Sequence, residues 1–472
     1  MESRELLSAT FGNALTFGND TGSSSANDVA TDAAGNSYMT GSFSGKVDFD
    51  PGAAVVELTA LGSTDAYVAK YAKDNTLLWV QRMGGDAASV DSSGTDVGRQ
   101  IEIDGSGNVY VVGEFIGAAD FGSTILSTAG TDRDGFVAKL DAGGTVLWAN
   151  RWGTAAEDYG RGGVGVDSAG NVYAAGVTGS SLVTNTGYDI LKFSASGSQL
   201  WSKSIVAPQQ IATADLAVDS SGNAFLAGSF KGTVDFDPSS KTRNVTVATS
   251  SPSGFVLKLN TSGTYKWVTP FASRWDGSHQ GYCKAQSVTL DGSGNVVVGG
   301  AYIYSVDFNP GSGTTTLPGL TGASAIQGAF VTKLNSSGGL IWARGLAANS
   351  SILLNGLDVD SEGSIYGTGN FLGTVDLDPG AGSVMRTTAG DSDIFVVKLN
   401  AAGNYSWAET FGGTGYDIGK GIAVDPTGGV SLAGQFEATI DFDPDATHAD
   451  DTDILTNPGI YKNAFRLWLR QV

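Results

Sequence analysis

Apolar and polar residues alternate along most of this chain in short runs. Between residues 98 and 152, the runs GRQIEID, NVYVVGEF, GFVAKLD and TVLWANRW occur in that order, with the turn GSGN after the first and AGG after the third. Alternation with period two is typical of half-buried strands, and Gly and Asn tolerate the positive φ of tight turns. The pattern predicts four strands, A to D, with tight turns after A and after C.

Two spacings recur through the whole sequence. A Lys precedes a Trp by nine residues in six places: Lys70 and Trp79, Lys139 and Trp148, Lys192 and Trp201, Lys258 and Trp267, Lys333 and Trp342, Lys398 and Trp407. An Asp-x-x-Gly turn begins at seven positions: Asp32, Asp104, Asp167, Asp219, Asp291, Asp360 and Asp425. Because a hairpin turn fixes register, we expect each Lys at the end of strand C and each Trp across from it on strand D. The Trp is predicted to pack between neighbouring sheets, and a cofactor platform is the alternative.

Four-stranded antiparallel units that repeat roughly every 50–70 residues are typical of β-propeller blades. Seven turns therefore predict an all-β, seven-bladed β-propeller of four-stranded blades, forming a single domain over residues 1–472.

The seventh unit has no strand D, because the chain ends after strand C. The segment LLSATFG at the N-terminus matches SWAETFG of the sixth unit, with Leu7 in the place of Trp407. We expect Leu6–Phe11, within a closing segment 1–12, to form the outer strand of the last blade, which is a 3+1 closure. Such pairing would remove the exposed edges of an open array.

The repeat resembles the bacterial seven-bladed β-propeller repeat family known as SBBP. The best-matching segments are GYDIGKGIAVD, at residues 415–425, and residues 158–176, and the resemblance covers nearly the whole chain. The chain departs from the pattern at Ser364 and Gly429, where the family has Asn. The resemblance implies a secreted or surface-exposed bacterial protein with an unidentified partner, and it implies no shared catalytic residues.

Charge and composition narrow the function classes. With 48 acidic and 27 basic residues, the formal net charge is −21, which disfavours binding to nucleic acid and to anionic membrane surfaces. No apolar run reaches the roughly 18 residues of a membrane span. The N-terminal residues do not read as a signal peptide, so we expect an extracellular or cell-surface protein whose signal is removed or excluded; a cytosolic chain is the alternative. Cys283, the sole cysteine, is expected to be buried and unreactive.

The long B–C and D–A connections vary, whereas the A–B and C–D turns are nearly constant, so we expect function on the face that carries the long loops. Five B–C segments share an acidic insert such as Val47-Asp48-Phe49-Asp50-Pro51, and the unit-five copy has Asp307 and Asn309. In an extended chain both acidic residues would face one side, where hard oxygen ligands suit Ca²⁺; turn chemistry at Asp-Pro is the alternative. The candidate calcium ligands are Asp48, Asp50, Asp235, Asp237, Asp376, Asp378, Asp441, Asp443 and Asp445.

Three basic residues, Arg99, Arg161 and Lys420, fall at the starts of strand A in units two, three and seven. Strand A lines the channel of a propeller, so they could form a cationic mouth for an acidic ligand. The alternative is pairing with the preceding Asp96, Asp158 and Asp417. Trp275 lies outside the repeat pattern, either packed under its loop or available as a contact residue, and Trp152 allows the same two interpretations.

The sequence offers no catalytic constellation. Two His residues cannot build a multi-His metal centre, and neither His279 nor His448 lies near a nucleophile motif. We therefore predict a non-catalytic structural or binding module for a protein or glycan partner, acting through the acidic loop face. The alternative is a quinoprotein-like or carbohydrate-active propeller enzyme, because propellers host both classes.

Overall fold

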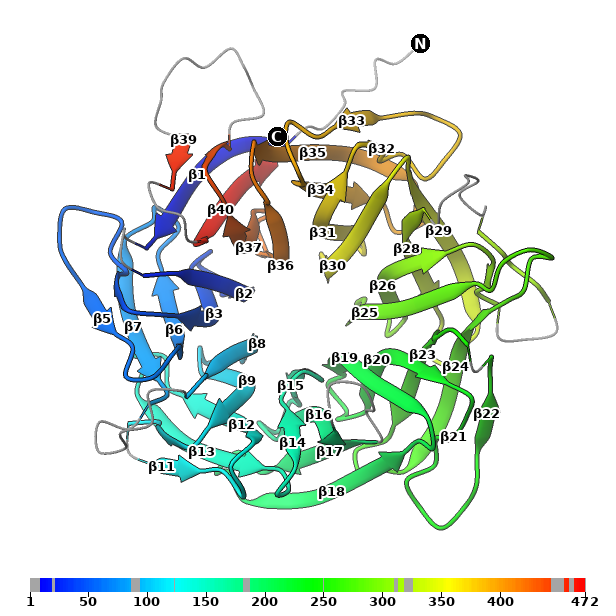
Figure 1. Cartoon of the computed structure of the whole chain (residues 1–472), viewed down its shortest axis with the longest axis horizontal. Coiled ribbons are helices and arrows are strands. Elements are labelled where there is room, and N and C mark those ends of the chain that lie inside the picture. Colours follow the sequence, from blue (N-terminus) through cyan, green and yellow to red (C-terminus); the bar gives the residue numbers. More distant parts are fainter. Residues whose placement is uncertain are drawn as a thin grey trace.

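The computed structural model describes residues 9–18, 22–85, 94–122, 124–180, 187–248, 250–309, 313–317, 326–442, 454–457 and 462–471. Within these ranges every regular element is a strand. Figure 1 shows the sheets arranged as a ring, with one strand of each repeat nearest the centre. The all-β class and the propeller-like arrangement are confirmed.

Strands A to D of each repeat pair in sequence order. The A strands, nearest the centre, are β2 (Ser24–Thr31), β8 (Val97–Ile103), β15 (Val164–Val166), β19 (Gln210–Val218), β25 (Tyr282–Leu290), β30 (Ser351–Val359) and β36 (Ile418–Val424). The B strands are β3 (Ser37–Phe43), β9 (Val109–Ile116), β16 (Val172–Ser180), β20 (Ala224–Lys231), β26 (Val296–Ile303), β31 (Ile365–Leu372) and β37 (Val430–Phe436).

The remaining strands lie farther from the centre. The C strands are β6 (Asp65–Tyr71), β12 (Arg133–Leu140), β17 (Gly187–Phe193), β23 (Ser253–Leu259), β28 (Gln327–Leu334), β34 (Asp393–Leu399) and β40 (Asn463–Gln471). The outer D strands are β7 (Leu77–Met83), β13 (Val146–Trp152), β18 (Gln199–Val206), β24 (Tyr265–Ser273), β29 (Leu340–Ala348), β35 (Tyr405–Gly413) and β1 (Ala9–Phe17). In the third repeat a further short strand, β14 (Glu157–Tyr159), precedes β15.

The B–C connections contain short strands. They are β4 (Lys46–Asp48), β5 (Glu57–Thr59), β10 (Ala118–Asp120), β11 (Ile125–Ser127), β21 (Thr233–Asp235), β22 (Asn244–Thr246), β27 (Val306–Asp307), β32 (Thr374–Asp376), β33 (Met385–Thr387), β38 (Thr439–Asp441) and β39 (Ile454–Thr456). Three of them, β27, β32 and β38, pair with the outer strand of the preceding repeat. Twelve strands, from the fifth repeat to the seventh, therefore belong to one sheet.

The six Lys–Trp pairs stand directly opposite each other on strands C and D, as predicted. Five of these indoles donate a hydrogen bond to the C–D turn of the next repeat. The bonds are Trp79 to Ala142 (3.1 Å), Trp148 to Ala195 (3.2 Å), Trp201 to Thr261 (3.1 Å), Trp267 to Ser336 (3.1 Å) and Trp342 to Ala401 (3.4 Å). The prediction that these Trp residues pack between sheets is confirmed.

In four repeats the Lys of this pair lies beside the Asp of the A–B turn of its own repeat. These residues are Lys70, Lys192, Lys333 and Lys398. In the first repeat Lys70 Nζ lies 3.4 Å from Asp32 Oδ2 and 4.5 Å from the centre of the Tyr38 ring. Tyr38 and Asn36 both donate hydrogen bonds to Asp32 Oδ2, at 3.1 Å and 2.8 Å. Asp32 Oδ1 accepts the backbone N–H groups of Ala34 and Asn36. One carboxylate thus joins strands A, B and C.

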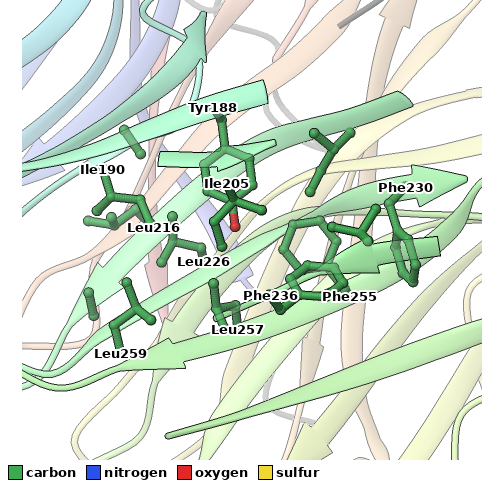
Figure 2. Packing of buried hydrophobic residues seen from close by; sticks show 14 of the residues in the cluster. Tyr188, Ile190, Ile205, Leu216, Leu226, Phe230, Phe236, Phe255, Leu257 and Leu259 are labelled. Carbon is green, nitrogen blue, oxygen red and sulfur yellow. The ribbon is translucent and has the colours of Figure 1, made fainter. Parts of the chain in front are cut away.

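Hydrophobic cores lie between neighbouring repeats. Figure 2 shows the core between repeats three and four, where Tyr188 and Ile205 pack near Leu226 and Phe255. Cys283 is fully buried in the next core, as predicted, and burial raises the pKa of its thiol. Equivalent clusters join each repeat to the next, including the last repeat to the first.

The N-terminal strand completes the sheet of the last repeat. Strand β1 runs antiparallel to β40 at the outer edge of the order β1-β40-β37-β36. Leu15 and Phe17, each 2% exposed, lie in the core shared by the last and first repeats. Strand pairing between the two ends of the chain was predicted correctly.

The bounds and register of this strand differ from the prediction. The strand is Ala9–Phe17 rather than Leu6–Phe11, and Asn13, not Leu7, takes the place of the Trp by standing opposite Trp468. The chain contains Thr-Phe-Gly twice, at residues 10–12 and 16–18, and the first copy was aligned with the sixth repeat. The second copy occupies the matching position, because Phe17 faces Ala464 as Phe411 faces Ile394.

A buried arginine joins the two ends. Arg466 takes the position on strand C where the other repeats carry an aliphatic residue: Val68, Val137, Ile190, Val256, Val331 and Val396. Its side chain is fully buried and donates hydrogen bonds to Asn13 Oδ1 (3.1 Å), Asn75 Oδ1 (2.5 Å) and Ser37 Oγ (2.8 Å). Burial lowers its pKa to about 10, so the guanidinium stays charged at neutral pH. Arg466 therefore connects the last repeat to the first repeat and to β1.

Arg466→Ala should lower the free energy of unfolding by roughly 3 kcal/mol, because it leaves a cavity and buried oxygens without a donor. Arg470→Ala on the same strand is the matched control, since Arg470 is exposed. Denaturant unfolding of both variants measures the difference. Equal, small losses would contradict a role for Arg466 in closing the ring.

Candidate functional site

The inner strands surround a central cavity of about 820 Å³. Its lining includes all three basic residues singled out in the sequence, Arg99, Arg161 and Lys420, and four carboxyl groups, Asp28, Glu102, Asp215 and Asp358. Arg99 is the third residue of strand β8, and Glu102 lies three residues farther along it. At about 3.3 Å per residue the two are separated by roughly 10 Å along the channel. The basic residues therefore lie toward the end of the channel where the D–A loops enter.

Two of these cations share a carboxylate that sequence reasoning missed. Glu114, fully buried on β9, contacts Arg99, and its Oε1 lies 3.1 Å from Arg161 Nη2 and 3.6 Å from Arg133 Nη1. Burial opposes ionisation of Glu114, but the charge and hydrogen bonds of Arg99 and Arg161 outweigh burial and lower its pKa. The sequence does single out this residue, because Glu114 follows the strand-B Gly at a position where the other repeats carry an uncharged residue.

The predicted alternative pairing with the preceding aspartates is wrong. Asp96 accepts backbone N–H groups of Gly85 and Ile116, and Asp158 accepts those of Thr154 and Gly179. Asp417 likewise accepts the N–H groups of Gly413 and Glu437. These aspartates hold loop backbone, and the cations remain at the channel.

Lys420 is held by neutral oxygens. Its Nζ donates to Ser25 Oγ at 2.6 Å, to Asn27 Oδ1 at 2.9 Å and to Gln435 Oε1 at 2.9 Å. Burial, followed by repulsion from Arg99 and Lys462, lowers the pKa of Lys420 to about 7. Its charge therefore changes near neutral pH.

The deeper carboxyl groups connect neighbouring A strands. Asp28 accepts the N–H of Ile101 at 3.0 Å, Asp215 that of Val288 at 2.8 Å, and Asp358 that of Val424 at 2.7 Å. Each bond crosses from one repeat to the next.

These groups also perturb one another's ionisation. Burial, with further repulsion from neighbouring carboxyl groups, raises the pKa of Asp28 to about 7 and that of Glu102 to about 8. Burial raises the pKa of Asp358 to about 6. Such groups hold protons near neutral pH, which is a property found at functional sites and in buried structural clusters.

The acidic inserts carry structural contacts. Their apolar residues Val47, Phe49, Val234, Phe236, Val306, Phe308, Val375, Leu377, Ile440 and Phe442 are fully buried. Asp48 Oδ1 accepts the N–H groups of Asp50 and Val56, and Asp235 and Asp376 repeat this arrangement. Asp50, Asp237 and Asp378 each accept an N–H two residues ahead. A shorter sixth copy, Ala119-Asp120-Phe121, was missed because Gly122 replaces the second Asp.

Calcium at these inserts stays a prediction. Asp441 lies on β38, whereas Asp443 and Asp445 lie outside the described residues. Among the residues that the structure describes, no three His, Cys, Asp or Glu side chains gather as a metal-binding group.

The exposed Trp275 is available for contact. Its side chain is 64% exposed, so the prediction that it packs under its loop is wrong. Trp152, by contrast, is buried in the core between the second and third repeats. Trp275 pairs with Gln280 in a small bridge on the D–A loop that also holds His279, which stacks on Tyr304.

The chain is similar to a WD repeat-containing protein over part of its length. No protein-family model matches the chain, so the SBBP resemblance has no support from one. An uncharacterized WD repeat-containing protein of Acanthamoeba polyphaga mimivirus is 24% identical over 209 residues, covering 41% of this chain and only 15% of that protein. In the described part of the chain, no helix is long and apolar enough to cross a membrane.

Solved structures include similar chains at low identity. The WD40 repeats of RRP9 are 10% identical with a TM-score of 0.35, covering 76% of this chain and 92% of that one. A gluconolactonase from Xanthomonas campestris is 11% identical with a TM-score of 0.30, covering 98% of both chains. At these values the activity of neither protein is assigned to this chain.

Glu102→Gln should stabilise the protein at pH 8 but not at pH 4. The folded-state pKa of Glu102 is about 8, above the ordinary 4.5, so between these values the unfolded state holds fewer protons and stability falls as pH rises. The amide removes that loss, and we expect a melting temperature about 2 °C higher at pH 8. Calorimetry at both pH values measures it, with the exposed Glu362→Gln as control. A gain of the same size at pH 4 would contradict the assignment.

Calcium binding at the inserts should raise the melting temperature of the protein, because the metal would bind only the folded state. Melting in calcium and in chelator measures this shift, and magnesium serves as the control. Superimposable curves would argue against calcium at these inserts.

Proposed function

We propose that this protein is a non-catalytic binding module whose channel mouth takes an anionic group of a protein or glycan partner. The observation that carries the proposal is the charge of that mouth within a chain of net charge −21. Arg99, Arg133 and Arg161 share the single carboxylate of Glu114, and Lys420 contacts neutral oxygens. The cations therefore outnumber the carboxylates that contact them.

Guanidinium groups suit this task. Arg binds carboxylates and phosphates through donors in a fixed plane, and the side chain of Arg161 is still 46% exposed beside Glu114. A low-dielectric channel strengthens the attraction, while the acidic surface around it disfavours extended polyanions such as nucleic acid.

The surrounding loops supply the remaining partner surface. The D–A and B–C connections vary among repeats, whereas the Asp-x-x-Gly turns do not. Trp275 projects from one D–A loop and offers an exposed aromatic contact. A rigid scaffold with one variable face is a common arrangement for binding proteins. We propose that the partner is met outside the cell or at its surface.

The number of blades in the fold is also part of the proposal. We propose that the chain forms seven four-stranded blades in the manner of the bacterial SBBP repeat. The A–B, B–C and C–D pairings and the seven inter-repeat cores support this interpretation, with β1 as the outer strand of the last blade.

A carbohydrate-active enzyme is the second candidate. It is favoured by Glu102 and Asp28, which line the same channel with raised pKa values and could serve as an acid and a base. Release of reducing sugar that is lost in Glu102→Gln would favour the enzyme over the binding module.

The binding proposal predicts that trigalacturonate or a triglutamate peptide binds at low ionic strength and that maltotriose does not. The double variant Arg99→Met with Lys420→Met should weaken binding at least tenfold. Binding should also weaken from pH 6 to pH 8, because Lys420, with its pKa of about 7, loses its charge there. Isothermal titration calorimetry measures both, and whichever acidic probe binds identifies the partner class. Failure of both probes, or equal binding to the double variant, would contradict the proposal.

A further inference from the structure

A second cavity, of about 320 Å³, opens beside the channel mouth. Its walls come from the third, fourth and fifth repeats, through strands β14, β16, β19, β20 and β25. Arg161, Ala214 and Gln286 line both cavities, so Arg161 stands at the border between them. This volume is near the lower end for small-molecule sites, which fits a ligand of about one ring.

The cavity lies where strand A of the third repeat is interrupted. In the other repeats strand A is continuous, but here β14 ends at Tyr159 and β15 begins at Val164. The segment between them is Gly160-Arg161-Gly162-Gly163. Gly163 has φ +98°, and a Cβ at Gly160 would lie 1.8 Å from the carbonyl oxygen of Gly113. Only glycine fits at both positions, and the interruption places Arg161 between the two cavities.

The polar groups around this cavity converge from different repeats. Arg161 comes from the third repeat, Thr213 and Ser229 from the fourth, and Lys284 from the fifth. Lys284 is exposed, its Nζ lies 5.6 Å from the centre of the Tyr282 ring, and it forms no salt bridge with a described residue. The Thr213 side chain is buried, and its hydroxyl has no hydrogen-bond partner among the described residues. A buried hydroxyl without a partner is uncommon in proteins, and here it lies in the wall of a cavity.

The remaining wall consists of Tyr159, whose ring lies 4.6 Å from the Arg161 guanidinium, and of small apolar residues. Val177, Ala212, Ala214 and Ala285, with Gly228, leave room along the cavity without adding charge. No carboxylate is among the lining residues, although Asp and Glu outnumber Lys and Arg in the chain. The lining therefore combines two cations, hydroxyl and amide groups, one aromatic ring and short apolar side chains, and of the two cations Arg161 also contacts Glu114.

We propose that this side pocket, bordered by Arg161, Thr213, Ser229, Lys284 and Gln286, binds one acidic sugar residue through its carboxylate. Arg161 and Lys284 face the carboxylate, and the hydroxyl and amide groups bind the ring hydroxyls. The inference rests on the proposed binding function and specifies its ligand as a hexuronic acid unit of a glycan.

The test is titration of wild-type protein with galacturonic acid, with galactose as the neutral analogue. Galacturonic acid should bind at least tenfold more tightly than galactose. Lys284→Met should lose at least tenfold in affinity for galacturonic acid, because Lys284 lines the side pocket but not the channel. Lys241→Met, an exposed lysine that lines neither cavity, is the charge-matched control and should bind as wild type. Melting curves of both variants should coincide with that of wild type, which separates lost affinity from lost folding.

The outcomes separate this inference from the proposed function. Unchanged galacturonic acid affinity in Lys284→Met, or equal affinity for galactose, would overturn the side pocket. If trigalacturonate binding is then still lost in the Arg99 and Lys420 double variant, the channel-mouth function stands alone. The converse result is loss of galacturonic acid binding in Lys284→Met, with trigalacturonate binding unaffected by the double variant. That result would support the side pocket and contradict the channel-mouth function.

Discussion

The carboxylate of the A–B turn is the contact on which the regularity of this structure depends. In the first repeat Asp32 accepts backbone N–H groups of its own turn and the side-chain donors of Asn36 and Tyr38, while Lys70 approaches from strand C. Burial opposes ionisation, but these hydrogen bonds and the charge of Lys70 outweigh burial and lower the pKa of Asp32. Trp79 stands opposite Lys70 and donates to the next repeat. In five repeats this indole bond connects one repeat to the C–D turn of the next, whereas the loops of the opposite face vary in sequence.

Local patterns were enough to predict much of the fold. Strand alternation, the Asp-x-x-Gly turns and the constant Lys–Trp distance report interactions within one or two hairpins, and these predictions hold. The closing strand shows the limit, because Thr-Phe-Gly occurs twice within eighteen residues and local similarity fits both copies. The pairing of Phe17 with Ala464 and the contact of Asn13 with Arg466 select the second copy, and both partners lie more than 400 positions away.

Only the basic residues of the candidate site could be predicted from the sequence. Arg99, Arg161 and Lys420 were placed at the channel from their position on strand A, and they line it. Their partner Glu114 lies on strand B, and the pairing depends on how neighbouring repeats pack. The side pocket depends on an interruption of strand A at Gly160 and Gly163, which the repeat pattern treats as an ordinary strand. Both Glu114 and the interruption of strand A are departures from the repeat pattern, and both lie beside the basic residues of the candidate site.

The contact between Asn13 and Arg466 also constrains the order in which the molecule assembles. The two residues are 453 positions apart, and β1, which precedes every other described strand along the chain, is the outer strand of the last sheet. It cannot take its place until strand β40 has been made. Until then the core that holds the apolar residues Leu15 and Phe17 lacks its members from the last repeat, Ala423, Ala433 and Ala464, and the first repeat lacks one neighbour. Because domains fold during synthesis from the N-terminus, the nascent chain must carry an unpaired strand throughout its production, and a second copy could capture that strand.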